Sequence, residues 1–217
     1  MKETLVIFQC CKKKSAIELY PNDNFDLAIR IPRTKKILDD AVVKFSRDGV
    51  IDISSPPVTS LSRYDGHFYN APRLRSRVAY EARHGPYQFL IMSAGYGFVH
   101  PFQRIRMYGQ RMTGRITRYW LNVGLPRVLE EFIETCKFRK VYGFFSKSAD
   151  YRKIFEAVNW HQLDRLREAG YFYLEGMRGA GKILKTSAML MLKLLDENFE
   201  EKPVLFRWSK PIFVRTL

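Results

Sequence analysis

The stretch Gln88-Phe-Leu-Ile-Met-Ser-Ala-Gly-Tyr-Gly-Phe-Val-His-Pro101 decides the fold of this chain. Its first six residues, Gln88–Ser93, form a short and mostly apolar run, which predicts a buried strand. Gly95 and Gly97 then predict a sharp turn at the carboxyl end of that strand. Ligands of open α/β sheets bind beyond this end of the strands, so the turn is a candidate site.

Strands and helices alternate from Gln88 onward. Further strands are predicted at Thr4–Cys10, Gly49–Ile53, Val141–Phe145 and Tyr171–Leu174, with one more within Pro203–Leu217. Helices are predicted at Arg73–Arg83, Arg127–Cys136, Ala149–Val158, Gln162–Glu168 and Ile183–Leu195. This alternation predicts one α/β domain over residues 1–217, with a central, mostly parallel or mixed sheet flanked by helices and a positively charged cleft at the strand carboxyl ends.

A formal net charge of +15 is the strongest feature of the composition. Such an excess raises encounter rates with polyanions, so DNA or RNA is the expected partner, with an anionic membrane surface behind it. No run approaches the roughly 18 apolar residues of a membrane span, and no membrane partner is expected. Three cysteines make no disulfide framework, and the first apolar run precedes its lysines, the reverse of a secretory signal. These features predict a cytoplasmic protein.

Arginine is concentrated in the middle of the chain. Twelve arginines and no lysine lie from Arg47 to Arg127, interleaved with tyrosines and phenylalanines. The planar guanidinium grips phosphate through two parallel hydrogen bonds, and aromatic rings stack on the bases of a single strand. The phosphate-binding residues expected here are Arg73, Arg75, Arg77, Arg104, Arg106, Arg111, Arg115 and Arg118. A solvated basic surface over core aromatics is the alternative.

Several polar residues stand where predicted strands end. Cys10 and Cys11 precede three lysines, whose charge would lower the pKa of a thiol, although buried cysteines usually only pack. Ser93 and Ser146 could bind a phosphate or a base edge, or cap the next helix. Tyr96 could stack on a base, act as an acid, or belong to the core. Histidines and cysteines show no metal-ligand spacing, so no metal site and no cofactor are expected.

The segment Gly176-Met-Arg-Gly-Ala-Gly-Lys182 fits the phosphate-binding pattern GxxxxGK between a strand and a helix. Ile183 follows it, where a hydroxyl would ligate Mg²⁺, and this argues against nucleotide hydrolysis. Backbone amides at the helix start, with Arg178 and Lys182, could still hold one phosphate. A tight turn into the helix is the alternative, and a nucleotide-binding enzyme is a further one.

Three segments together resemble the YaaA family. They are Phe8-Gln-Cys-Cys-Lys-Lys-Lys14 after the first strand, Met92–Pro101 with Tyr108 beyond it, and Phe145-Ser-Lys-Ser-Ala-Asp-Tyr151 after a later strand. They occur in the family's order within residues 4–151, about two-thirds of the chain. The basic segment Gln103–Tyr108 replaces the acidic residue or Pro-Tyr usual there, and no helix-hairpin-helix is evident.

The resemblance implies an α/β fold with a positively charged cleft and an association with DNA and oxidative stress. A related domain in archaeosine synthase acts on a modified tRNA base, and its Cys and Lys are similar to Cys10 and Lys14. The leading hypothesis is therefore a nucleic-acid-binding protein whose cleft accommodates a base or nucleotide. As an enzyme it would modify that base or cut its glycosidic bond; a non-enzymatic stress protein is the alternative. Expected catalytic residues are Cys10, Lys14 and Tyr96, in a cleft lined by Ser93, Gly95, Gly97, Tyr108, Ser146 and Tyr151.

Overall fold

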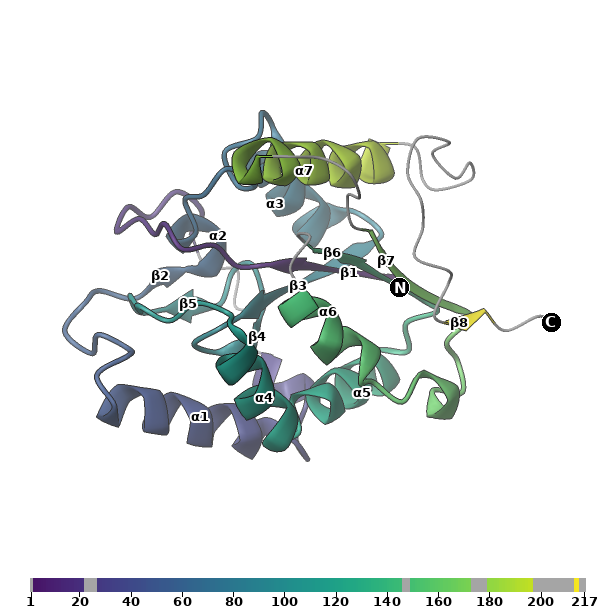
Figure 1. The fold of residues 1–217 in the computed structure, drawn as a ribbon. Coiled ribbons are helices and arrows are strands. Elements are labelled where there is room, and N and C mark those ends of the chain that lie inside the picture. The colour runs from purple at the N-terminus through teal and green to yellow at the C-terminus, as the bar shows by residue number, and fades with distance from the viewer. Residues whose placement is uncertain (1, 22–26, 146–148, 173–178, 197–212, 215–217) are drawn as a thin grey trace.

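The computed structural model describes residues 2–21, 27–145, 149–172, 179–196 and 213–214. These residues form a six-stranded sheet in the order β4-β3-β1-β6-β7-β8 (Figure 1). The four central strands are parallel: β1 (Thr4–Gln9), β3 (Tyr87–Ser93), β6 (Lys140–Phe144) and β7 (Glu168–Phe172). The two antiparallel edge strands are β4 (Gly97–Val99) and β8 (Phe213–Val214). The predicted mostly parallel α/β sheet is confirmed.

Helices cover both faces of this sheet (Figure 1). One face carries α1 (Lys35–Arg47), α4 (Gly114–Asn122), α5 (Leu125–Cys136) and α6 (Ala149–Glu156). The other carries α2 (Ser60–Arg63), α3 (Leu74–His84) and α7 (Ala180–Asp196). The remaining elements are the 3-10 turns η1 (Leu27–Arg30) and η2 (Trp160–Gln162), and the antiparallel pair β2 (Val58–Thr59) and β5 (Arg104–Ile105).

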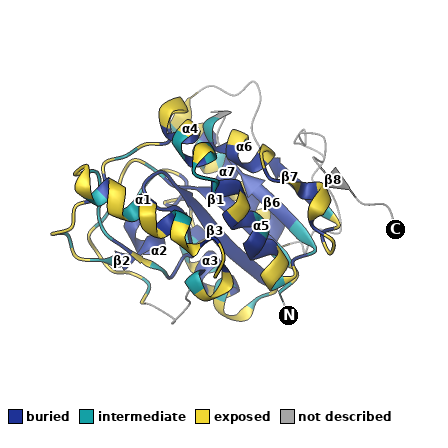
Figure 2. Cartoon of the chain, turned by 90° about the horizontal axis from the view of Figure 1, so that it is seen from below, coloured by how far each residue is buried: buried dark blue, intermediate teal, exposed yellow. Residues whose placement is uncertain are grey.

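The central strands are apolar because helices cover them on both sides. Leu5 to Phe8 of β1 are completely buried, and every residue of β3 is buried. Parallel strands of this kind have near-continuous hydrophobic runs instead of an alternating pattern. Figure 2 shows the outcome: the strands are buried, while the outer faces of α1, α4, α5 and α6 are exposed.

Two predicted elements are wrong. Gly49–Ile53 forms no strand, because it makes only a single antiparallel bridge, Ile51 with Tyr108. Gln162–Glu168 forms no helix: a 3-10 turn ends at Gln162, and Glu168 already pairs with Lys140 in β7. In the predicted tail strand, only Phe213–Val214 lies within the described residues.

The order of the strands places a switch point in the middle of the sheet. From β1 the chain runs to β3 on one side, whereas from β6 it runs to β7 on the other. Adjacent strands whose connections leave in opposite directions open a crevice at their carboxyl ends, where α/β proteins bind ligands. The carboxyl ends of β1 and β6 therefore mark the place to search for a site.

A buried carboxylate of α5 fixes the start of α1. Glu131, with only 3% of its side chain exposed, accepts bonds from the backbone N–H groups of Arg33 (2.9 Å) and Thr34 (2.7 Å) and from the Thr34 hydroxyl (2.6 Å). Burial favours its protonated form, but these bonds outweigh burial and lower the pKa of the carboxyl. Such a group stabilises the fold above its unfolded pKa of about 4.3, and this contribution is lost as the pH falls through the folded pKa.

Glu131→Gln is therefore expected to lower the free energy of unfolding by about 2 kcal/mol near neutral pH. The NH₂ group of glutamine would face the N–H and O–H donors of Arg33 and Thr34, so that hydrogen bonds are lost. Urea titrations at about pH 7 and about pH 3 should show the difference from wild type shrinking in acid. Glu134→Gln, on the same helix but about half exposed, is the control and should have little effect. An equal loss at both pH values would contradict the account.

Candidate functional site

A thiol and a phenol meet where β1 and β6 end. Cys10 directly follows β1, and its backbone N–H donates to the carbonyl of Met92 in β3 (3.0 Å). Its Sγ lies 3.2 Å from the hydroxyl of Tyr151, which α6 carries beyond β6. Both residues are buried. The sequence predictions that place Cys10 and Tyr151 at one sheet edge thus correspond to a direct contact.

Three hydroxyl groups form a second, adjoining cluster. The Tyr108 hydroxyl lies 2.9 Å from that of Tyr64 and accepts a bond from the Ser93 hydroxyl at 3.0 Å. All three residues are buried, and burial raises the pKa of both phenols well above the usual value. These hydroxyls therefore stay protonated near neutral pH and act as hydrogen-bond donors and acceptors.

Lys14 lies over this cluster. Its ammonium lies 4.0 Å from the centre of the Tyr108 ring and donates to the carbonyls of Cys11 and Lys12 (both 3.2 Å). Its backbone also bridges to Tyr64. Burial lowers the pKa of Lys14, so a larger fraction of this amine is neutral than at a solvated lysine. The expected association of Lys14 with Tyr108 is therefore seen in the structure.

Cys11 does not become the low-pKa thiol that the neighbouring lysines suggest. Burial raises its pKa to about 12, which outweighs the attraction of Lys14, and its Sγ donates to the carbonyl of Lys13 (3.0 Å). A neutral thiol is a poor nucleophile. Cys10, against Tyr151, stays the candidate of the pair.

The two glycines of the turn have different surroundings. A Cβ on Gly95 would lie 2.7 Å from the Tyr108 ring, so glycine permits that ring's close approach. Gly97 has φ +71°, and a Cβ there would lie 2.7 Å from Leu38 and 2.9 Å from Leu125. Gly95 thus borders the tyrosine cluster, whereas Gly97 packs against the helices α1 and α5.

Tyr96 and Ser146 complete the predicted cleft residues. The ring of Tyr96 meets that of Tyr108 edge-on, with centroids 5.6 Å apart, and its hydroxyl accepts a bond from the backbone N–H of Arg106 (3.0 Å). Burial raises the pKa of Tyr96, and 8% of the residue is exposed. This geometry makes Tyr96 a wall of the site. Ser146 lies outside the described residues.

Five of the eight predicted phosphate arginines have partners within the protein. Arg75, for example, donates to the carbonyl of Tyr64 (2.8 Å) and to Asp65 (3.1 Å), with 12% of its side chain exposed. The others pair as follows: Arg73 with Asp196, Arg77 with Glu81 and Asp196, Arg104 with Glu18, and Arg106 with the carbonyl of Ser55. These guanidinium groups hold loops and helices together.

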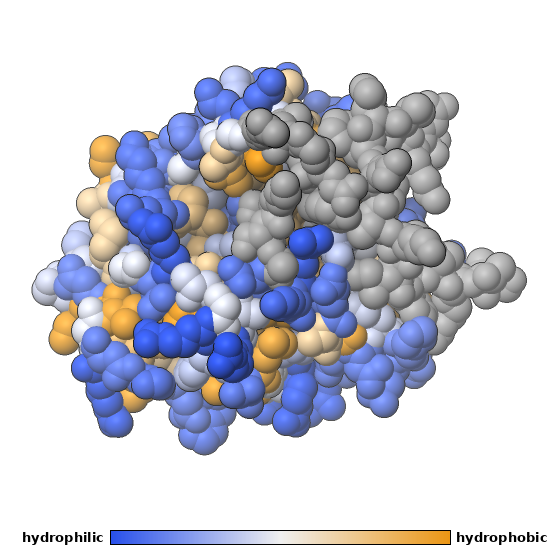
Figure 3. Space-filling model, in the orientation of Figure 1, coloured by the Kyte–Doolittle hydropathy of each residue, from blue (hydrophilic) through white to orange (hydrophobic). Residues whose placement is uncertain are grey.

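Arg111, Arg115 and Arg118 are different. All three are exposed, and none forms an ion pair within the described ranges. Arg115 and Arg118 share a face of α4, one turn apart, and α4 packs on α6, the helix of Tyr151. Arg111 lies close enough to Lys14 for its charge to act on that amine. Figure 3 shows hydrophilic residues with hydrophobic ones between them on this face of the molecule. We call these three residues the free arginines.

Tyr64 and Tyr69 are not among the site residues that the sequence predicts. Both are buried, and the Tyr69 hydroxyl donates to the carbonyl of Gln9 at the end of β1 (2.8 Å). Gly66 lies against Cys11, where a Cβ would approach the Cys11 Cβ to 2.8 Å. The density of tyrosines in a segment otherwise rich in small polar residues was the available signal.

The GxxxxGK segment falls partly outside the described residues, which resume at Gly179. Gly179 precedes α7 with φ +90°, and Lys182 in the first turn is exposed. Gly181 faces the ring of His67, 3.2 Å from a Cβ built on it. The described part thus shows a turn into a helix, which the tight-turn and the phosphate-binding interpretations both expect.

Comparison with protein-family models finds no match for this chain, and comparison with curated proteins finds none either. Across the described residues, no three His, Cys, Asp or Glu side chains come together in a way that could hold a metal ion. A helix of sufficient length and apolarity to cross a membrane is likewise not found in that part of the chain.

Proposed function

We propose that this protein binds nucleic acid, with phosphates on the free arginines and a base or nucleotide at the adjoining site of Lys14, Tyr108 and Cys10. The observation that carries the proposal is the contrast among the arginines. Five of the eight predicted phosphate ligands have intramolecular partners, while Arg111, Arg115 and Arg118 are exposed and lie on α4 or just before it. Guanidinium groups left to solvent beside a site at the sheet edge are suited to phosphate.

The charge of the whole chain supports this partner. A net charge of +15 attracts polyanions over long distances, and local guanidinium groups then fix the bound strand. Arg115 and Arg118 lie on α4, which packs on α6, and Arg111 lies before that helix and acts on Lys14. A strand held by them would therefore pass the carboxyl ends of β1 and β6. A nucleotide extruded from that strand would reach Lys14 and the tyrosine cluster.

The chemistry at this place suits a base more than a sugar or lipid. The site offers an amine with a lowered pKa, a buried thiol and protonated phenols. A lowered pKa favours the neutral amine, the form that can act as a base or as a nucleophile. We propose base modification or glycosidic bond cleavage as the reaction class, in keeping with the resemblance of Phe8–Lys14 and Met92–Pro101 to the YaaA family, which stays a prediction.

A binding protein without turnover is the second candidate, and one observation favours it. The hydroxyls of Tyr64, Ser93 and Tyr108 satisfy one another, and that of Tyr96 is bonded to the backbone. A network so complete stabilises the fold without any substrate. In that case the free arginines alone carry the function.

Fluorescence anisotropy with single- and double-stranded DNA and RNA over a salt series tests the proposal. We expect binding that weakens steeply with salt, because each phosphate contact releases about 0.7 to 0.9 counterions. We expect single strands to bind more tightly than duplexes, because only they present bases for stacking. Weak binding to all four polymers at low salt would contradict the nucleic-acid proposal.

The same titrations separate the two candidates. Nucleoside analysis by mass spectrometry after incubation would show an altered or released base if the protein is an enzyme. Lys14→Met should abolish that turnover while leaving the salt dependence of binding close to wild type, since the free arginines are intact. Tight binding without any altered nucleoside, in intact and damaged substrates, would favour the binding protein.

A further inference from the structure

A cavity of about 450 Å³ lies by the amino ends of β1 and β3, at the opposite end of these strands from the candidate site. Lys2 precedes β1 there, Gln88 comes from β3, and Arg30 ends the turn η1. Lys137 and Phe138, just beyond α5, close another side. Its volume falls within the range of about 300 to 1,000 Å³ that is typical of small-molecule sites.

The wall of this cavity is positively charged. Lys2, Arg30 and Lys137 line it, and none of its lining residues is acidic. Arg30 and Lys137 are exposed and form no ion pair within the described part of the chain. The nearby carboxylate of Glu81 is paired with Arg77 at 3.1 Å. Three basic residues from three separate segments therefore line one hollow whose wall has no acidic residue, while Glu81, outside that wall, attracts Lys2.

Gln88 adds a neutral polar group to the same wall. The residue is 7% exposed and lines the cavity. A side-chain amide offers two donors and an acceptor, so it can bond to a ligand placed there. Its N–H groups can donate to an anion, and its position in a central strand holds it rigidly.

Helix ends explain part of this arrangement. Lys2 donates to the carbonyls of Glu81 (3.1 Å) and Ala82 at the end of α3, and Lys137 follows α5. Cations at helix carboxyl ends offset the helix dipole. This accounts for Lys2, but it explains neither the presence of Arg30 in the same wall nor the lack of an acidic lining residue.

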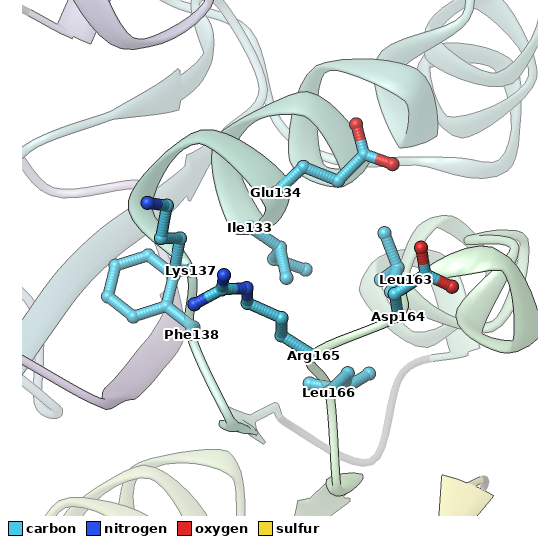
Figure 4. Close-up of a pocket in the computed structure, with 8 residues that line it drawn as sticks. All are labelled: Ile133, Glu134, Lys137, Phe138, Leu163, Asp164, Arg165 and Leu166. Carbon is cyan, nitrogen blue, oxygen red and sulfur yellow. The ribbon is translucent and has the colours of Figure 1, made fainter.

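A neighbouring cavity of about 260 Å³ provides a comparison. Lys137 and Phe138 line it too, but Glu134 and Asp164 stand beside Arg165 in its wall (Figure 4). Its charges are thus of both signs. Of the two cavities, the larger is the one whose charged lining residues are all basic.

We propose that the larger cavity binds a small molecule through a phosphate group. Phosphate carries about two negative charges and three acceptor oxygens, which match three cations and an amide better than a carboxylate does. The cavity is separate from the proposed nucleic-acid site, since the cavity lies at the amino ends of the central strands and that site lies at their carboxyl ends. Its ligand is a phosphate monoester of mononucleotide size or smaller.

Isothermal titration calorimetry with inorganic phosphate and with adenosine monophosphate tests this, with adenosine as the probe lacking phosphate. We expect both phosphates to bind and adenosine not to. The double variant Arg30→Gln/Lys137→Gln should weaken binding by about tenfold or more, the effect of losing charge-assisted hydrogen bonds. The matched control Arg127→Gln/Lys153→Gln removes the same charge from exposed positions elsewhere and should bind as wild type.

A near-isosteric variant guards against misfolding. Gln88→Glu places a negative charge in the cavity and should abolish phosphate binding if the amide faces the ligand. Removing the free arginines should leave binding unchanged, which separates this site from the nucleic-acid proposal. No binding to wild type at millimolar phosphate, or full binding by both the double variant and Gln88→Glu, would overturn the assignment.

Discussion

Arg63→Met is expected to lower the free energy of unfolding by about 3 kcal/mol or more. The Arg63 residue is completely buried, and its guanidinium donates to the carbonyls of Ser15 (2.7 Å), Pro56 (2.5 Å) and Ile105 (3.2 Å). It thereby connects three segments: Ser15 just after the lysines Lys12–Lys14, the loop before β2, and the strand β5. Methionine fills a similar volume but leaves three carbonyls without a donor, each costing about 1 to 3 kcal/mol when buried.

Urea unfolding of Arg63→Met and Arg127→Met measures this effect. Arg127 is exposed and should tolerate the change within about 0.5 kcal/mol. Arg63→Lys should fall between wild type and Arg63→Met, because an ammonium keeps the charge but lacks the planar fork. A loss below about 1 kcal/mol for Arg63→Met would show that water replaces the guanidinium and that these three bonds do not hold the segments together.

Replacing Arg111, Arg115 and Arg118 together by Gln is expected to weaken binding of a single-stranded oligonucleotide by about 10- to 100-fold, from three exposed contacts of about 0.5 to 1 kcal/mol each. The three side chains have no ion pair in the described structure, so their loss should leave the fold intact. Circular dichroism and urea unfolding of the triple variant would verify this.

A control must lose the same charge, because the net charge alone steers polyanions. Arg127, Arg165 and Arg167 are exposed and lie on α5 or just before β7, away from the carboxyl ends of β1 and β6. Their joint replacement by Gln removes three charges and should weaken binding by no more than about threefold. Equal losses in both triples would mean that binding depends on overall charge alone.

The sheet and the position of the candidate site at the carboxyl ends of its strands were predictable because they depend on local pattern. Buried parallel strands are apolar runs. The predicted strands Thr4–Cys10 and Gln88–Ser93 therefore match β1 and β3 to within one residue at each end. Polar residues that follow such runs must gather at the carboxyl edge. That is why Cys10, Ser93 and Tyr151, far apart in the sequence, lie around one site in the structure.

The roles of individual arginines were not predictable in the same way. Arginine content indicates phosphate, but whether a guanidinium faces solvent depends on which carbonyl or carboxylate the fold brings beside it. Arg75 is held by Asp65, ten residues away, and Arg104 by Glu18, much farther along the chain. The pKa of Cys11 depends likewise on burial, which a count of neighbouring lysines does not reveal.

The error at Gln162–Glu168 has a similar origin. The leucines of this segment, Leu163 and Leu166, are both buried beneath a turn, at a spacing that also suits a helix. Glu168 pairs with Lys140 as the first residue of β7, so pairing within the sheet overrides the local preference of this segment for a helix. Tyr64 and Tyr69 were not predicted as site residues for the related reason that the local sequence does not show their burial.

The salt dependence of oligonucleotide binding tests the central claim most directly. Plots of log affinity against log salt should be linear for wild type and for both triple variants. The account predicts that Arg111→Gln/Arg115→Gln/Arg118→Gln reduces the slope by about 2, as three lost contacts to a single strand require, while the control triple keeps the wild-type slope. A slope unchanged by loss of the free arginines would contradict the claim that they hold the phosphates.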